Sequence, residues 1–141
     1  MSSKSTATWI GDMAFDVEVN NHHFTIDANE GVGGKDRGPR PKPLILASLI
    51  GCTGMDVVSI LGKMKVIGYK FHLEAEAEQT DKHPKYYHTI YLSYIFEGEN
   101  LPIDKLKRAV ELSETRYCGV SEMLRKSSKI ITKIILNGKE I

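Results

Sequence analysis

The sequence predicts an α+β fold in which strands precede and follow one long apolar helix. Residues 13–28, 71–96 and 129–136 have the alternation, or the wealth of β-branched and aromatic residues, that is typical of strands. Residues 44–62 form an apolar stretch with one charged residue that is too long for one strand. The 141 residues suit one folding unit with its own core, so we expect a single domain over residues 1–141.

The composition argues against several classes of protein. The chain is 41% hydrophobic and 26% charged, which is ordinary for a soluble globular protein. Its net charge is +1 and it has no run of basic residues, so we expect no nucleic-acid partner. The first residues, MSSKSTATWIGD, lack the apolar segment of a signal peptide, so we expect a cytoplasmic protein.

The first predicted structure is a hairpin followed by a loop. Residues 13–19 alternate apolar and polar side chains, Asn20 and Asn21 suit a turn, and residues 22–28 return as the partner strand. Residues 30–43 are rich in Gly and Pro and form a loop long enough to be suspected of function. Its cations are Lys35, Arg37, Arg40 and Lys42.

The apolar stretch is predicted to be a helix over residues 44–66. Pro41 and Pro43 suit its start, and Gly68 suits its end. Gly51 and Gly54 each cost about 1 kcal/mol of helix propensity, which makes sense if another backbone packs close to them.

The same helix is nearly long enough to span a membrane. From Leu44 to Gly62 the single charged residue is Asp56, near the middle of the stretch. A carboxylate at that depth costs about 2.5 kcal/mol or more on insertion scales. We therefore predict a helix buried in a protein core and no membrane partner.

The second half of the chain is predicted to contain two strands, a helix, a short helix and a final strand. The strands cover residues 71–78 and 86–96, and Pro102 begins a helix that Gly119 breaks just after Cys118. Residues 121–127 suggest a short helix, and residues 129–136 a closing strand.

Two cysteines, Cys52 and Cys118, lie 66 positions apart. Neither has a neighbouring Cys or His, so their spacing predicts neither a disulfide scaffold nor a zinc site. The five histidines do not converge in the predicted elements, and we expect no metal and no cofactor. Each cysteine is either an inert core residue or a nucleophile, and Cys118 lies where a helix start would favour a thiolate.

Asp56 lies one helical turn from Cys52 and on the same helix face. A negative charge there raises the pKa of a thiol and opposes nucleophilicity. We therefore interpret Asp56 as a polar anchor that is bonded to a neighbour, rather than as a base.

Two segments, PLILASLIGCTGMDVVSIL and ETRYCGVSEMLRKSSKI, resemble the OsmC/Ohr superfamily of osmotically inducible and organic hydroperoxide resistance proteins. The likeness covers nearly the whole chain and is greatest to the OsmC-like branch. It implies antiparallel sheets around a long buried central helix, in an intertwined homodimer with sites at the subunit interface.

The resemblance also implies a peroxidase that reduces organic hydroperoxides. Cys52 would be the peroxidatic thiol and Cys118 the resolving thiol, and a dithiol reductant of the lipoyl type would reduce the resulting disulfide. An arginine, held by a glutamate, would keep Cys52 ionised.

The chain departs from this pattern at the start of the helix, where Pro43 stands in place of the family glutamate. The arginine would be Arg40 or Arg37, and the sequence does not choose between them. A second hypothesis therefore stays open: a non-catalytic OsmC-like dimer that binds a small apolar ligand or senses redox state.

Overall fold

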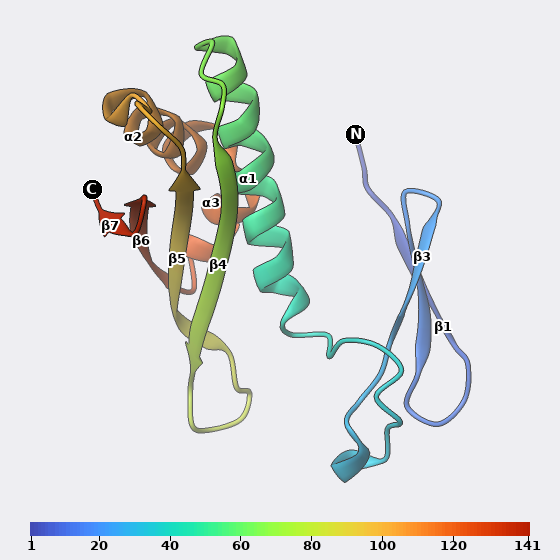
Figure 1. Cartoon of the computed structure of the whole chain (residues 1–141). Helices are drawn as coiled ribbons and strands as arrows, with labels where there is room; N and C mark the ends of the chain where they lie inside the picture. Colours follow the sequence, from blue (N-terminus) through green and yellow to red (C-terminus); the bar gives the residue numbers. More distant parts are fainter. The chain divides into compact units, whose positions relative to one another are not determined.

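The computed structural model describes residues 1–141, which form two compact units, residues 1–45 and 46–141. The chain contains seven strands and three α-helices, so the predicted α+β class is confirmed (Figure 1). A single domain over residues 1–141 stays a prediction.

The first unit contains a three-stranded antiparallel sheet of β1 (Ser5–Trp9), β2 (Phe15–Val19) and β3 (His22–Ile26). Asn20 and Asn21 have φ angles of 49° and 65°, the left-handed pair that a tight hairpin turn requires. The predicted hairpin is therefore confirmed. Strand β1 was not predicted, because all five of its residues are exposed and its sequence, STATW, has only two apolar residues.

The loop after β3 contains a short 3₁₀ helix, Glu30–Val32, and then runs back along the sheet. The Asp27 N–H donates to the carbonyl of Pro39, 3.2 Å away. A Cβ at Gly38 would lie 1.9 Å from the carbonyl oxygen of Thr25, so the loop can approach β3 this closely only with glycine.

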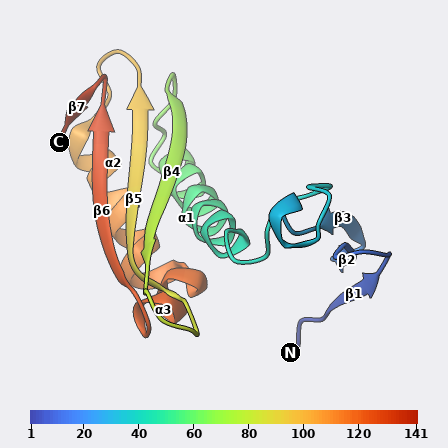
Figure 2. The same cartoon turned by 90° about the horizontal axis from the view of Figure 1, so that it is seen from below.

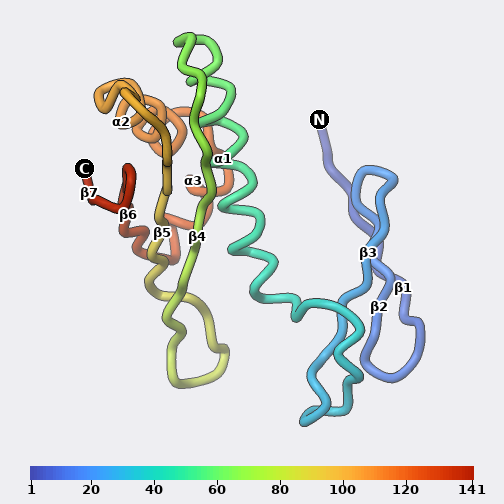
Figure 3. Tube along the Cα trace, viewed as in Figure 1, coloured from blue at the N-terminus to red at the C-terminus, as the bar shows by residue number.

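The second unit contains a four-stranded sheet in the order β4-β5-β6-β7. Its strands are β4 (Lys70–Gln79), β5 (Tyr87–Glu97), β6 (Lys129–Leu136) and β7 (Lys139–Glu140). The prediction of antiparallel pairing is wrong for β5 and β6, which are parallel. The reason is the connection between them, which crosses over through helices and re-enters the sheet in the same direction (Figure 3).

The helices lie on one face of this sheet (Figure 2). They are α1 (Leu44–Lys63), α2 (Ile103–Leu112), a π-helical turn (Ser113–Tyr117) and α3 (Gly119–Arg125). Helix α1 ends three residues before the predicted end, because Lys65 takes a left-handed φ of 60° ahead of Gly68.

The core of the second unit joins one face of α1 to β5 and α2. Burying each large side chain in this core contributes about 1.5–3 kcal/mol. The fully buried members with the largest side chains are Tyr94, Phe96, Leu49, Leu61, Ile90, Leu92, Leu106 and Val57.

The opposite face of α1 is exposed in this chain. Met55 is 77% exposed and Val58 50%, so the predicted burial of α1 is found on one face. A Cβ at Gly54 would lie 3.0 Å from a Leu73 side-chain atom and one at Gly51 would meet nothing, which corrects the expectation of a close backbone there. By length and composition α1 could cross a membrane, and the core helix of a soluble protein has the same properties.

Candidate active site

Two segments far apart in the sequence bring both thiols and one carboxylate together in the second unit. Helix α1 carries Cys52 and Asp56 one turn apart, and the chain after α2 carries Cys118. The two sulfur atoms and a carboxylate oxygen of Asp56 all lie within 4.8 Å of one another. Both cysteines are free thiols; Cys118 is buried and Cys52 is partly buried.

A π-helical turn sets the position of Cys118. Its N–H donates to the carbonyl of Ser113, 2.8 Å away, which is the bond that closes the wide turn. Such turns occur frequently at functional sites. Cys118 then caps α3, and its sulfur accepts a hydrogen bond from the N–H of Ser121 at 3.3 Å. The predicted helix start at Cys118 is therefore confirmed.

Ser113 connects this turn to α1. The residue is fully buried, and its hydroxyl donates to Oδ2 of Asp56 at 2.9 Å. The interpretation of Asp56 as a polar anchor bonded to a neighbour is confirmed. Sequence reasoning missed Ser113, because its partner lies 57 positions away and a lone serine near a helix end carries no signal.

The surroundings of Cys52 hold its thiol in the neutral form. Burial raises the pKa of Cys52, and its hydrogen bond with Cys118 and the charge of Asp56 raise the pKa further. A hydrogen bond from the Val120 N–H works in the opposite direction. Because the raising effects are the stronger, Cys52 needs an added positive charge to become a thiolate at neutral pH.

The two predicted activating cations, Arg37 and Arg40, lie in the first unit. Arg37 donates from Nε to Asp27 at 3.1 Å and also pairs with Asp12 at 3.1 Å. Arg40 pairs with Asp36 and donates to the carbonyls of Gly38 and Asp27. Each arginine is therefore held by an aspartate, although Pro43 replaces the family glutamate. A role for either in activating Cys52 stays a prediction.

A partly buried ion pair supports the π-helical turn. Glu114 is 8% exposed, and its carboxylate pairs with Arg125 at 3.3 Å and accepts from the Thr132 hydroxyl at 2.7 Å. Arg125 also donates to the backbone carbonyl of Glu114. These bonds tie the turn to α3 and β6. Sequence reasoning missed this cluster too, since its members come from three elements.

Two hollows border α1. One, of about 320 Å³, is lined by Asp56 together with Ser59, Lys63 and Tyr117, so it leads to the carboxylate beside the thiols. The other, of about 490 Å³, is almost wholly apolar and lies over the exposed face of α1 and the edge strand β4. It is lined by Ile50, Met55, Val58, Phe71 and Leu73, among others.

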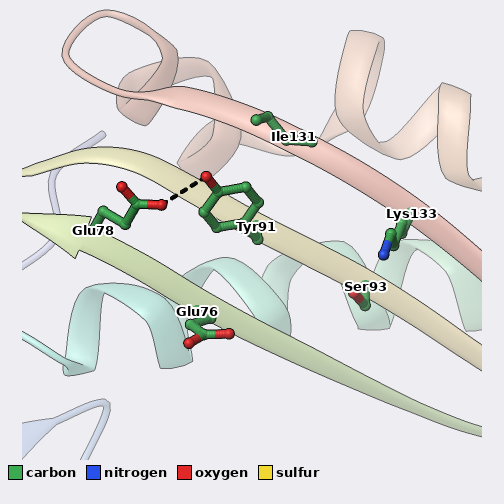
Figure 4. A pocket seen from close by; sticks show the side chains of 6 residues that line it. All are labelled: Glu76, Glu78, Tyr91, Ser93, Ile131 and Lys133. Atoms are coloured by element: carbon green, nitrogen blue, oxygen red, sulfur yellow. Dashed lines mark hydrogen bonds between the residues drawn. The ribbon is translucent and has the colours of Figure 1, made fainter.

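A third hollow, of about 400 Å³, lies on the sheet face that the helices do not cover (Figure 4). Tyr91 donates there to Glu78 at 2.7 Å, beside Glu76 and Lys133. Its side chains belong to the outward-facing positions of β4, β5 and β6, so it is separate from the thiols. None of the predicted site residues lines it.

Known proteins resemble this chain along nearly its whole length. Residues 33–133 match the family of OsmC-like proteins. Protein YhfA of Escherichia coli K12 is 32% identical over 123 residues, which cover 86% of this chain and 89% of YhfA. A hypothetical protein from Aquifex aeolicus is 25% identical in structure-based alignment, with a TM-score of 0.81 over 97% of this chain and 98% of the other.

More distant structures share the fold alone. An organic hydroperoxide resistance protein from Elizabethkingia anophelis is 17% identical, with a TM-score of 0.71 over 97% of each chain. Together with the family match and the relative at 32% identity, these likenesses agree with the α+β fold described above. The chain belongs to the OsmC-like protein family.

Proposed function

We propose that the protein is a thiol-dependent peroxidase that reduces organic hydroperoxides. The observation that carries this proposal is the placement of the Cys52 and Cys118 sulfurs within 4.8 Å of each other on separate elements. Two thiols at that separation can close a disulfide with little backbone movement. Both cysteines are free thiols, so neither belongs to a structural disulfide.

The proposed reaction has three balanced steps. The Cys52 thiolate attacks the terminal peroxide oxygen, the O–O bond breaks, and the released alkoxide takes a proton to become an alcohol. Cys118 then attacks the sulfur of the Cys52 sulfenic acid, which forms the disulfide and releases water. A dithiol of the lipoyl type reduces the disulfide by exchange and is itself oxidised to a disulfide.

The thiolate requires a cation, and we propose that Arg40 or Arg37 supplies it. Arg37 already pairs with two carboxylates, one of them the buried Asp27. Arg40 pairs with one carboxylate, that of the exposed Asp36, and otherwise with two carbonyls. Arg40 therefore has more remaining capacity to stabilise a thiolate.

We further propose that the protein is a cytoplasmic homodimer. The apolar hollow over α1, with the exposed Met55 and Val58, is a surface that a second copy of the chain could cover. Apolar walls of this kind suit an alkyl or lipid hydroperoxide. A reducing cytoplasm would keep both thiols free.

Two observations favour a second candidate function. Burial and Asp56 raise the pKa of Cys52, and Pro43 replaces the family glutamate. Both features oppose formation of the Cys52 thiolate that a peroxidase needs. If they prevent peroxidase activity, the protein would be a dimer that binds a small apolar ligand or senses redox state through its thiols.

The reaction with one equivalent of an alkyl hydroperoxide separates these candidates. For a peroxidase we expect both free thiols of each chain to disappear rapidly, and Cys52→Ser to block the loss of the remaining thiol. Cys118→Ser should still react at Cys52 and stop at the sulfenic acid, which a dimedone label detects. Thiols that stay unchanged over minutes in the wild-type protein would contradict the peroxidase and favour the second candidate.

The arginine assignment is tested by comparing Arg40→Ala with Arg37→Ala. The variant that slows peroxide-driven thiol loss identifies the activating cation, and we expect Arg40→Ala to have the larger effect. At the activating position, substitution of the arginine by Lys should slow thiol loss less than substitution by Ala, since Lys keeps the charge. Equal rates in both alanine variants and the wild type would overturn the assignment of the cation.

A further inference from the structure

Asp56 has no role in the proposed peroxidase. Its charge raises the pKa of Cys52 and so opposes formation of the nucleophile. Yet the Ser113 hydroxyl donates to an Asp56 carboxylate oxygen at 2.9 Å. A carboxylate oxygen of Asp56 lies within 4.8 Å of both sulfur atoms. A carboxylate beside two thiols opposes the formation of a thiolate and favours the binding of a cation.

The distances suit a shared metal ion. Three donor atoms, Cys52 Sγ, Cys118 Sγ and one Asp56 oxygen, lie within 4.8 Å of one another. Zinc binds thiolate sulfur at about 2.3 Å and carboxylate oxygen at about 2.0–2.2 Å, so donors around one ion lie somewhat closer together than this upper limit. The donors must therefore move about 1 Å closer together when an ion binds.

The neighbours of these donors meet two further requirements of a metal site. Ser113 orients the carboxylate in the way that outer hydrogen bonds orient metal ligands. A carboxylate accepts several bonds, so this hydroxyl leaves capacity for an ion. The hollow of about 320 Å³ that Asp56 lines opens the carboxylate donor to solvent.

We propose that reduced Cys52 and Cys118, together with Asp56, bind one thiophilic divalent cation, with Zn²⁺ as the best match. Two thiols lose their protons to the solvent as the ion binds, and the two thiolates and the carboxylate give the site a net charge of −1 with the ion. Three protein ligands leave a fourth position for water or a small ligand. The spacing in the sequence did not predict this site, since the fold alone brings the donors together across 66 positions.

The site serves as a switch on the thiols. A bound ion occupies the same sulfurs that would react with peroxide, so metal and peroxide compete for them. This inference does not depend on the peroxidase proposal, because ion binding requires the donors and not an activated Cys52.

Cobalt provides the test, because tetrahedral thiolate-bound Co²⁺ absorbs visibly and is displaced by Zn²⁺. Reduced wild-type protein titrated anaerobically should develop the thiolate-to-cobalt band with an end point of one ion per chain, and one equivalent of Zn²⁺ should remove it. Two protons should be released per ion. Asp56→Asn should weaken binding by at least about tenfold, since even outer ligands contribute this much. Asp104→Asn, an exposed acid at the start of α2, is the matched control and should change nothing.

The oxidised wild-type protein gives a control that needs no substitution. After diamide closes the disulfide, the band should be absent, and it should return on reduction. Cys52→Ser and Cys118→Ser should each abolish it. The absence of a band in reduced wild-type protein, an end point of one ion per two chains, or unchanged affinity in Asp56→Asn would each overturn the proposal, whatever the result with peroxide.

Discussion

Different interactions stabilise the two compact units of the chain. In residues 1–45 the buried residues are Ala14, Asp27 and Gly34, and large apolar side chains such as Trp9 and Val32 are each 65% exposed. In residues 46–141 a continuous apolar core joins α1, β5 and α2. The first unit therefore depends on hydrogen bonds around a buried carboxylate, and the second on apolar burial.

The contrast extends to the charged residues. Asp27 accepts bonds from the N–H groups of Ala28, Lys35 and Arg37 and from the Arg37 side chain, so one carboxylate organises the loop that carries the predicted activating arginines. In the second unit, Glu114 organises the turn that positions Cys118. The loop that carries the proposed cation and the turn that positions Cys118 are thus each organised by a buried carboxylate.

The largest difference should appear when one phenylalanine of each unit is truncated. Phe96 is fully buried, so Phe96→Ala should lower the free energy of unfolding by about 3–5 kcal/mol. Phe24 is 38% exposed, and Phe24→Ala should cost about 1 kcal/mol. Urea denaturation followed by circular dichroism measures both values. Similar losses in the two variants would remove the contrast between the units.

The next effect concerns the acid that supports the thiol site. Arg125→Ala leaves Glu114 buried without its ion-pair partner and should cost about 2 kcal/mol. This is less than for a fully buried pair because the Arg125 side chain is 37% exposed. Arg108→Ala, in the exposed pair with Glu111, is the control and should cost about 0.5 kcal/mol or less. A cost for Arg125→Ala no greater than that of the control would show that the pair does not support the turn.

A smaller effect is expected on the reactivity of Cys52. Burial raises the pKa of Cys52 and the Asp56 charge adds to it, so Asp56→Asn should lower the pKa and shift the alkylation profile toward lower pH. The rate at which iodoacetamide labels the Cys52 peptide at pH 7 should rise a few-fold, as mass spectrometry would measure. A slower rate in Asp56→Asn would mean that the carboxylate assists the thiolate.

The smallest expected change is in the first unit, and it develops as the pH falls. Burial alone would raise the pKa of Asp27, but the backbone N–H groups of Arg37 and Ala28 and the Arg37 side chain lower it from 3.8 to about 2. Because the folded pKa is depressed, this carboxylate stabilises the unit above about pH 4, and the contribution is lost as the pH falls through 2.

Trp9 is the single tryptophan of the chain and lies in the same unit, so its fluorescence reports on this acid transition. We expect a change between pH 4 and pH 2 in the wild type and its loss in Asp27→Asn. An unaltered acid transition in Asp27→Asn would assign the effect to another group.

The sequence predicts local elements well where a single face is apolar. The hairpin at residues 15–26 and β4 follow from alternating side chains, α1 follows from its long apolar stretch, and Cys118 lies at the predicted helix start. The sequence does not predict β1, whose side chains are all exposed, or the parallel pairing of β5 and β6, which depends on a crossover.

The sequence likewise predicts only part of the candidate site. Cys52 and Asp56 share a helix, so their proximity follows from spacing, whereas the nearness of Cys118 was implied by the family resemblance. Ser113, Glu114 and Arg125 were missed because their contacts join separate elements of the fold. Polar contacts between distant segments leave no periodic pattern, so only coordinates reveal them.

The connectivity of the thiols under mild oxidation is the most direct test of this account. Dilute wild-type protein treated with diamide should lose two hydrogens per chain, and peptide mapping should recover Cys52 linked to Cys118 of the same chain, while Cys52→Ser and Cys118→Ser stay free of that link. Two thiols that remain titratable after oxidation, or cross-links that form only between chains, would contradict the shared site.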